Sequence, residues 1–220
     1  MTATDLARKL PFWERLDDSE KQAVSSAAAL RQYGRDAVLH GGDSSCLGLL
    51  YIISGGVRVY IVSEEGREIT LFRAAAGDTC VLSASCVISQ IQFETLMVTE
   101  SPTDVLILNS GVFSKLTENN IYVRCFAYEL AAERFSAAMR VFQSLLFESF
   151  DRRLAGFLLE RTAQAGSDEL RMTQEQIASE INSAREVVTR KLRQFADEGM
   201  IGLRRGVITV KDADALRRML

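Results

Sequence analysis

The feature that most restricts the possible folds of this chain is the stretch 118–148, which contains neither glycine nor proline. Apolar residues recur in it at a spacing of seven, at Ile121, Tyr128, Phe135 and Phe142. Further small or apolar residues follow three and four positions later, which is the stripe of a single amphipathic helix. About thirty helical residues extend for about 45 Å at ~1.5 Å per residue, more than one β domain can cover. We therefore expect a seam between two copies of the chain; the alternative is a long helix packed only on its own domain.

Residues from about 34 to 113 show the pattern of short β-strands. Apolar runs such as Leu49–Ile53 and Val57–Val62 alternate with turns such as Gly55-Gly56 and Gly77-Asp78. Short strands separated by glycine-rich turns are typical of a sandwich or a barrel. This part of the chain is therefore expected to be all β.

Helical patterns flank the β-region on both sides. Residues 12–33 are expected to form a helix, with Asp17, Asp18 and Ser19 as its start signals. After residue 150 the chain returns to shorter helices and ends with a hairpin. The expected parts are 1–117, 118–148 and 149–220.

Charge is distributed unevenly along the chain, whose net charge is −3. Residues 1–149 hold 13 basic and 18 acidic side chains, a net charge of −5. Residues 150–220 hold 13 and 11, a net charge of +2. An acidic front part and a mildly basic back part are typical of a sensor joined to a DNA-binding module. Because +2 is a small charge, the placement of the arginines has to support this interpretation.

The segment 172–197 has the pattern of two helices joined by a tight turn. Thr173 and Gln176 have the spacing of a capping box, in which side chain and backbone satisfy each other. A turn at Asn182 follows, and Ser183-Ala184-Arg185-Glu186 has the spacing of a second capping box. Two helices so arranged form a helix-turn-helix, whose second helix enters the major groove of DNA.

The second of these helices carries side chains that can read bases. Arginine pairs bidentately with guanine, glutamate accepts from cytosine N4, and threonine contacts a thymine methyl or a phosphate. Four such residues occupy the outer side of its first two turns, whereas Val187, Val188, Leu192 and Phe195 are expected to face the core. The expected DNA-contacting residues are Arg185, Glu186, Thr189, Arg190, Thr173, Ser183, Lys191 and, in the terminal hairpin, Arg205.

A solvated helix face is the alternative for Arg185–Arg190. A Glu186–Arg190 pair on such a face contributes only a few tenths of a kcal/mol. The two capping boxes and the basic hairpin weigh against this alternative.

The chain resembles the Crp/Fnr superfamily of transcriptional regulators from about residue 12 to 218. The motifs that carry the resemblance are Val38-Leu39-His40-Gly41-Gly42-Asp43, Leu50–Val57, Glu64–Ile69, Gly77-Asp78, Asp151–Ala155 and Arg185–Arg190. The last of these matches the family's recognition-helix pattern R-E-x-V-x-R, by which Arg185, Glu186 and Arg190 would read the bases.

The resemblance implies an α+β fold. It comprises an N-terminal β-roll (jelly roll) like those that bind cyclic nucleotides, a long dimerisation helix and a C-terminal winged helix-turn-helix. It also implies a homodimer on double-stranded DNA with a TGTGA- or TTGAT-like inverted repeat, and RNA polymerase as a further partner.

The family's effector motif is missing. Cyclic-nucleotide members carry a Gly-Glu pair and a later Arg-Ser or Arg-Thr to hold the phosphate, whereas residues 80–94 contain neither. Cyclic AMP is therefore not expected as the effector. The oxygen sensors hold an iron–sulfur cluster with N-terminal cysteines, but no cysteine precedes Cys46.

Thiol and hydroxyl side chains occupy the region where the cassette would be. We expect a signal at this pocket, which could be redox chemistry or persulfidation of cysteine, or a small apolar or heme-like ligand. A third possibility is that the cysteines are only small buried hydrophobes. The cofactor stays unknown, and His40 is not expected to bind heme. The expected sensor residues are Cys80, Ser83, Ser85, Cys86 and Cys125.

Other classes of protein fit the sequence poorly. One histidine, no Cys-x-x-Cys pair and no phosphate loop argue against a metal site or an enzyme. No apolar run reaches the ~18–20 residues of a membrane helix, so a cytoplasmic protein is expected. A β-roll module without a DNA role is the alternative of another class, and it predicts no salt-dependent DNA binding.

Overall fold

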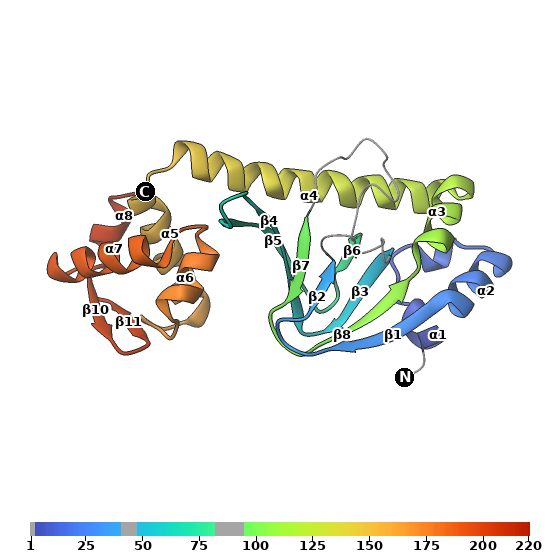
Figure 1. The fold of residues 1–220 in the computed structure, drawn as a ribbon, viewed down its shortest axis with the longest axis horizontal. Coiled ribbons are helices and arrows are strands. Elements are labelled where there is room, and N and C mark those ends of the chain that lie inside the picture. Colours follow the sequence, from blue (N-terminus) through green and yellow to red (C-terminus); the bar gives the residue numbers. More distant parts are fainter. Residues whose placement is uncertain (1–2, 41–47, 82–94) are drawn as a thin grey trace. The chain divides into compact units, whose positions relative to one another are not determined.

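The computed structural model describes residues 3–40, 48–81 and 95–220 (Figure 1). The chain forms two compact units, Met1–Met139 and Arg140–Leu220. Ser83, Ser85, Cys86 and Cys46 lie outside the described residues.

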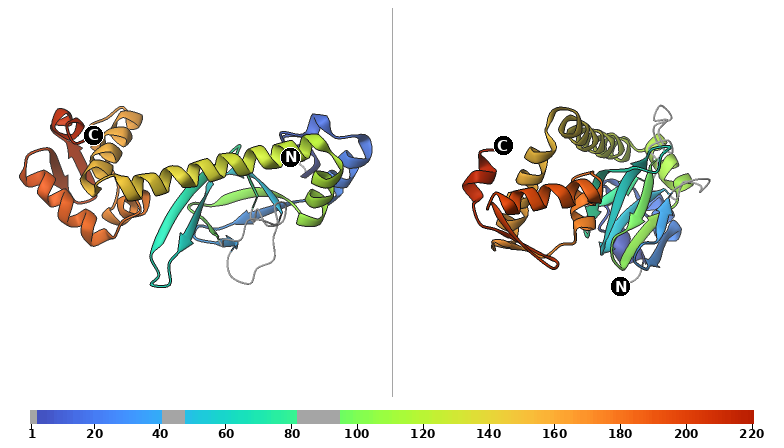
Figure 2. Two further views of the ribbon diagram at one scale, coloured as in Figure 1. Left: turned by 90° about the horizontal axis from the view of Figure 1, so that it is seen from above. Right: turned by 60° about the vertical axis from the view of Figure 1, so that its left-hand side comes forward.

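Two antiparallel four-stranded sheets form the body of the first unit, as the β-pattern predicts, and we refer to the two sheets together as the β-roll (Figure 2). One sheet has the order β1-β8-β3-β6 and the other the order β2-β7-β4-β5. The strands are β1 (Ala28–Tyr33), β2 (Val38–His40), β3 (Leu49–Ser54), β4 (Gly56–Val62), β5 (Glu68–Ala75), β6 (Thr79–Val81), β7 (Leu96–Thr99) and β8 (Thr103–Leu108). The cluster between the sheets includes Leu50, Ile52, Val57, Val105 and Cys80.

The turn between β3 and β4 requires glycine. Gly55 has φ of 80°, and a Cβ atom there would lie 2.4 Å from the carbonyl oxygen of Pro102. Next to it, the Gly56 N–H donates to Thr103 Oγ1 at 3.2 Å. Gly55 therefore lets two segments that are distant in the sequence approach closely.

The expected helix over 12–33 is wrong in its last part. A short 3₁₀ turn, η1 (Trp13–Arg15), precedes α2 (Asp18–Ala27), which starts at a capping box between Asp17 and Glu20. From Ala28 the chain is strand β1, paired with β8 from Ala28↔Leu108 to Tyr33↔Thr103. Six residues of cross-strand pairing with a distant segment outweigh the local helical preference of the alanines.

Helix α4 (Ile121–Phe147) is the long helix that the sequence predicts. It follows α3 (Ser110–Asn119), and its buried residues Val123, Ala127 and Leu130 belong to the cluster that also contains Leu49 and Phe113. That cluster includes residues of α1 (Ala3–Ala7) as well. No helix of the described residues is both long and apolar enough to cross a membrane.

The second unit is a small helical domain with a three-stranded sheet of order β10-β11-β9. Its core gathers apolar residues from each of the four helices that follow α4, among them Leu154, Ile177, Val188, Phe195 and Leu216. The elements are α5 (Phe150–Ala165), β9 (Glu169–Leu170), α6 (Gln174–Glu180), α7 (Arg185–Asp197), β10 (Ile201–Arg204), β11 (Val207–Val210) and α8 (Ala213–Arg217).

Candidate DNA-binding site

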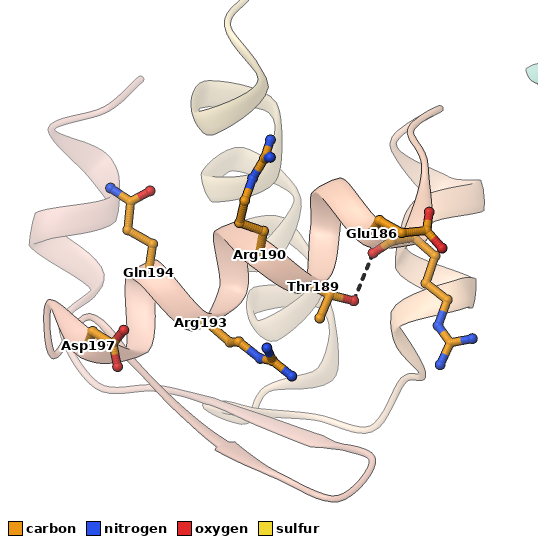
Figure 3. Close-up of a pocket in the computed structure, with 7 residues that line it drawn as sticks. Glu186, Thr189, Arg190, Arg193, Gln194 and Asp197 are labelled. Atoms are coloured by element: carbon orange, nitrogen blue, oxygen red, sulfur yellow. Dashed lines mark hydrogen bonds between the residues drawn. The ribbon is translucent and has the colours of Figure 1, made fainter.

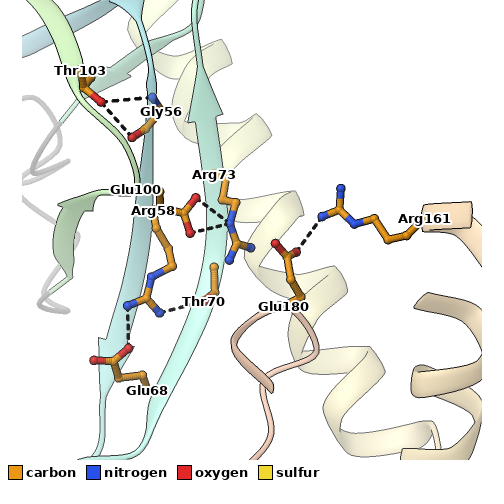
Figure 4. Close-up of polar contacts among 9 residues, drawn as sticks. All are labelled: Gly56, Arg58, Glu68, Thr70, Arg73, Glu100, Thr103, Arg161 and Glu180. Carbon is orange, nitrogen blue, oxygen red and sulfur yellow. Dashed lines mark hydrogen bonds and ion pairs between the residues drawn. The ribbon is translucent and has the colours of Figure 1, made fainter. Parts of the chain in front are cut away.

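Helix α6 begins at the capping box that the sequence predicts. The Gln176 N–H donates to Thr173 Oγ1 at 3.1 Å, and the Thr173 N–H donates to Gln176 Oε1 at 2.8 Å. Arg161 Nη2 of α5 lies 2.8 Å from Glu180 Oε2 at the other end of α6 (Figure 4). Both ends of this helix are therefore fixed within the unit.

The turn between α6 and α7 is tight and almost buried. Asn182 has φ of 53°, a left-handed conformation that asparagine tolerates better than most residues. Its side chain is 9% exposed, and the Ser183 N–H donates to the Ala178 carbonyl at 2.9 Å. This turn fixes the position from which α7 starts.

The second predicted capping box is wrong. The N-cap residue of α7 is Ala184, which makes no side-chain cap hydrogen bond, and Ser183 lies one residue too early. Alanine has no oxygen that could accept from the first N–H groups of the helix. Helix α7 therefore lacks the stabilisation that α6 receives from Thr173.

The two faces of α7 differ sharply. Val188, Leu192 and Phe195 are fully buried, which confirms their predicted place in the core, whereas Val187 is only partly buried and lies outside the core cluster. The opposite face bounds a shallow surface pocket of about 530 Å³ (Figure 3). Its lining residues are Arg185, Glu186, Thr189, Arg190, Arg193, Gln194 and Asp197. The four residues predicted to read bases thus lie together on one exposed surface.

Thr189 is held in place by residues on either side of the turn. Its Oγ1 lies 2.5 Å from Gln174 Oε1 and 2.8 Å from the Arg185 carbonyl oxygen. A hydroxyl has one proton, so it donates to one of these acceptors at a time. When it donates to Gln174, the amide N–H₂ of that glutamine keeps its two donors for other partners.

A second groove, of about 500 Å³, lies beside the first turn of α7 and the β10–β11 hairpin. Thr173 and Arg205, both predicted DNA contacts, line it together with Arg185 and Arg204. Glu175, which was not among the predicted site residues, also lines the groove, with Oε2 3.8 Å from Arg185 Nε. Glu175 lies within the predicted capping box of α6, but Arg185 is ten residues further along the chain, so the local pattern did not predict this pairing.

Lys191 differs from the other predicted contacts. Its Nζ lies 2.8 Å from Asp151 Oδ1 of α5 and 2.8 Å from Gln194 Oε1, and its side chain is 20% exposed. In this arrangement the ammonium group ties α7 to α5. A DNA contact by Lys191 stays a prediction, as does one by the half-buried Ser183.

The two described cysteines that were predicted as sensor residues lie in different surroundings. Cys80 on β6 is 2% exposed, and burial raises the pKa of its thiol to about 12. Arg134 of α4 lies nearby, donating from Nη2 to the Thr79 carbonyl at 3.1 Å and placing Cζ 4.7 Å from the centroid of the Phe72 ring. Cys125, by contrast, is exposed. Among the described residues no group of three or more His, Cys, Asp or Glu could hold a metal ion.

The β-roll has its own network of ion pairs, on β4, β5 and the loop after β7. Arg58 Nη2 lies 2.6 Å from Glu68 Oε2, and Arg73 Nε lies 2.9 Å from Glu100 Oε2 (Figure 4). The first pair links the neighbouring strands β4 and β5, and the second links β5 to the loop after β7.

The predicted dimer residues lie on the outer side of α4. Ile121, Tyr128 and Phe135 are 56%, 53% and 65% exposed, and Phe142 is partly exposed. Large apolar side chains in such a row are unusual on the surface of a monomer.

Comparisons with known proteins identify both units. Residues 152–219 match the model of the Crp-like helix-turn-helix domain. A solved Crp/Fnr-family transcriptional regulator from Eubacterium rectale is 39% identical, with a TM-score of 0.86, over 96% of this chain and 98% of its own.

Two more distant relatives are similar to this chain over most of their length. The cAMP-activated global transcriptional regulator CRP of Pasteurella multocida is 22% identical over 80% of this chain and 86% of its own length. The c-di-GMP responsive regulator CLP of Xanthomonas campestris is 17% identical, with a TM-score of 0.70, over 88% of this chain and 99% of its own.

The family comprises DNA-binding transcription regulators, typically dimeric, and not enzymes. With a β-roll, a long helix and a winged helix-turn-helix in this order, and with 39% identity over nearly its whole length to a regulator of that family, the chain belongs to the Crp/Fnr family of transcription regulators.

Proposed function

We propose that two copies of this chain bind an inverted-repeat DNA site through α7, under the control of a signal other than cyclic AMP. The observation that carries the proposal is the exposed face of α7, on which Arg185, Glu186, Thr189 and Arg190 lie together. On this face, Glu186 and Arg190 lie about half a helical turn from the fully buried Val188.

The base-reading roles follow from the donors and acceptors on this face. Arg185 and Arg190 suit bidentate pairing with guanine O6 and N7, and Glu186 suits cytosine N4. With two copies of α7 in successive major grooves ~34 Å apart, the target is an inverted repeat with TGTGA- or TTGAT-like half-sites.

The second groove suits the phosphate backbone. Arg204 and Arg205 line it from the hairpin and Thr173 from the start of α6. Contacts of this kind position a protein on DNA without reading the sequence. Arg205 is therefore assigned to affinity and Arg190 to specificity.

The dimer is supported by the exposed apolar row of α4. A side chain such as Phe135, 65% exposed in a single chain, gains about 25 cal/mol for each Å² of apolar surface that a partner buries. RNA polymerase is proposed as a further partner on the basis of the family alone.

Two observations bear on the signal. The cyclic-nucleotide motif is missing from residues 80–94. Two proteins to which this chain is similar are named for different nucleotides, cAMP and c-di-GMP. A thiol with a pKa of about 12, as at Cys80, is protonated near neutral pH and reacts slowly with oxidants. Thiol sensing is therefore assigned to the exposed Cys125 or to Cys86. A small apolar ligand is the second candidate, favoured by the apolar surroundings of Cys80.

The test is fluorescence anisotropy of an inverted-repeat duplex against a scrambled duplex, at a fixed and stated salt concentration. The proposal predicts tighter binding of the inverted repeat, and a change after peroxide or persulfide treatment that a Cys125→Ser or Cys86→Ser variant loses. Sequence-specific binding that does not change after peroxide or persulfide treatment supports a small apolar ligand as the signal. Equal binding of both duplexes at every salt concentration would favour a β-roll module without a DNA role.

A further inference from the structure

One hydrogen bond joins residues of the two grooves in the DNA-binding unit. Gln174 of α6 lines the groove beside the hairpin, together with Arg204 and Arg205. Thr189 of α7 lines the pocket on the exposed face of that helix. Thr189 Oγ1 lies 2.5 Å from Gln174 Oε1, and both side chains are half-buried. The recognition-helix pattern, which covers Arg185–Arg190, does not include Gln174.

The proton in this hydrogen bond belongs to Thr189. The carbonyl oxygen of a glutamine side chain has no hydrogen, so the hydroxyl has to be the donor. The separation of 2.5 Å agrees with an O–H···O bond, whereas a bond from an amide N–H to a hydroxyl oxygen is longer, about 2.7–3.2 Å. The Gln174 carboxamide is therefore oriented with its oxygen toward Thr189 and its N–H₂ group away from it.

A second acceptor lies within reach of the same hydroxyl. The Arg185 carbonyl oxygen is 2.8 Å from Thr189 Oγ1 (Figure 3). Because this carbonyl lies four residues earlier in α7, it is also the ordinary helical acceptor of the Thr189 backbone N–H. The Gln174 oxygen has no such bond to share, so it is the acceptor that holds the hydroxyl proton.

The position of this proton determines which bases Thr189 can contact. A hydroxyl whose proton is held within the protein presents only lone pairs to DNA, beside the methyl group of the side chain. It can accept from the amino group of adenine N6 or cytosine N4, and the methyl can pack on the methyl of thymine. Guanine presents the acceptors O6 and N7, which need a donor. Guanine is therefore disfavoured at the base that faces Thr189.

The other end of the Gln174 carboxamide suits a DNA phosphate. Its N–H₂ group is directed away from Thr189, and the groove that Gln174 lines contains three arginine side chains and one glutamate. Phosphate oxygens accept hydrogen bonds from amide N–H groups and are attracted by this excess of positive charge. A phosphate bound there keeps the amide oxygen on Thr189, because a rotated carboxamide would direct its oxygen at the phosphate.

We propose that Gln174 determines DNA specificity through Thr189. Its N–H₂ group binds a phosphate, its oxygen holds the Thr189 proton, and Thr189 therefore discriminates against guanine. The inference rests on the proposed DNA binding through α7 and adds a residue that lies outside the recognition helix. A phosphate contact by itself carries no sequence information. This one influences base reading because the same amide group fixes the proton of a hydroxyl that faces a base.

The experiment is fluorescence anisotropy of the full-length chain with operator duplexes in which each base pair of the half-site is replaced in turn, at a fixed salt concentration. Thr189→Ala identifies the base position that Thr189 reads, since base preference is lost there. Wild type should bind guanine at this position more weakly than the preferred base by about two- to ten-fold, the effect of one hydrogen bond.

Two substitutions of Gln174 separate its two roles. Gln174→Leu removes the acceptor and the donors, so affinity should fall for all sequences and the discrimination against guanine should disappear. Gln174→Glu keeps an acceptor for the hydroxyl but has no N–H₂ group, so affinity should fall for all sequences while the discrimination remains. Gln164→Leu, at an exposed glutamine of α5 outside both grooves, is the matched control and should change neither.

The outcomes separate the inference from the proposed function. Equal binding of the operator and a scrambled duplex by wild type would overturn DNA reading by α7, and this inference with it. If wild type binds specifically, the inference is overturned when Gln174→Leu keeps the full discrimination, when Gln174→Glu loses as much of it as Gln174→Leu, or when Thr189→Ala weakens all sequences alike. Thermal unfolding checks that each variant is folded, and Gln174→Ala replaces Gln174→Leu if the leucine variant is not.

Discussion

The DNA-binding unit and the β-roll belong to one family fold but preserve different parts of it. In the DNA-binding unit, the residues that match the family pattern lie together on the exposed face of α7. In the β-roll, the strands match but the phosphate-binding residues do not, and the described cysteine there is buried among apolar residues. The difference teaches that the DNA-binding role can be argued from particular side chains, whereas in the β-roll the sequence shows only that the phosphate-binding motif is missing from residues 80–94.

The largest expected effect concerns base reading. Arg190→Ala should cost about 1–3 kcal/mol at the preferred site and relax base preference at one position of each half-site, because a bidentate guanine contact is lost. Anisotropy titrations against single-base operator variants measure this. Arg205→Ala is the matched comparison and should weaken all sequences alike. If Arg190→Ala and wild type bind the preferred site equally well, Arg190 does not read a base.

The next effect tests the buried thiol of the β-roll. Burial raises the pKa of Cys80 from 9.0 to about 12, so the unfolded chain releases this proton at lower pH than the folded chain does. The stability that this thiol contributes is present below pH 9 and is lost as the pH rises toward 12. Thermal unfolding between pH 8 and 11 should therefore show a steeper loss of Tm in wild type than in Cys80→Ala. Parallel curves for the two proteins would contradict a buried, protonated thiol.

A third prediction addresses the start of the recognition helix. Ala184→Ser supplies the missing N-cap oxygen and should stabilise the protein by about 0.5–2 kcal/mol, as other N-cap serines do. Ser183→Ala should cost little, because Ser183 is not the N-cap residue. Urea denaturation of both variants measures the difference. A large loss in Ser183→Ala with no gain in Ala184→Ser would restore the capping box that the sequence suggested.

The smallest expected effect concerns Glu175 in the arginine-lined groove. Its carboxylate lies 3.8 Å from Arg185 Nε, and both side chains are exposed. Exposed pairs contribute ~0.2–1 kcal/mol, so Glu175→Gln should raise affinity for all DNA sequences by about two- to four-fold at low salt. Glu169→Gln, an exposed acid of the same unit outside the two pockets, is the control. An equal gain in the control would mean that net charge alone, and not the groove, sets this effect.

Local signals in the sequence determined much of the output unit. The capping box of Thr173 and Gln176, the turn at Asn182 and the split between Val188 and the arginines all depend on residues within one or two helical turns. The length of α4 was equally local, since it follows from the absence of glycine and proline in 118–148. Such local signals predict structure without knowledge of which distant segments of the chain meet.

Long-range contacts decided what the sequence could not. Strand β1 replaced the end of an expected helix because it pairs with β8, some seventy residues away. Lys191, which was expected to contact DNA, forms an ion pair with Asp151 of α5. Arg185 lies near Glu175, on the other side of the turn between α6 and α7. Cys80 and Cys125, predicted together as sensor residues, lie in different surroundings, since Cys80 is buried in the β-roll core and Cys125 is exposed on α4. Pairing and burial of this kind depend on which distant segments meet, and only the tertiary structure contains that information.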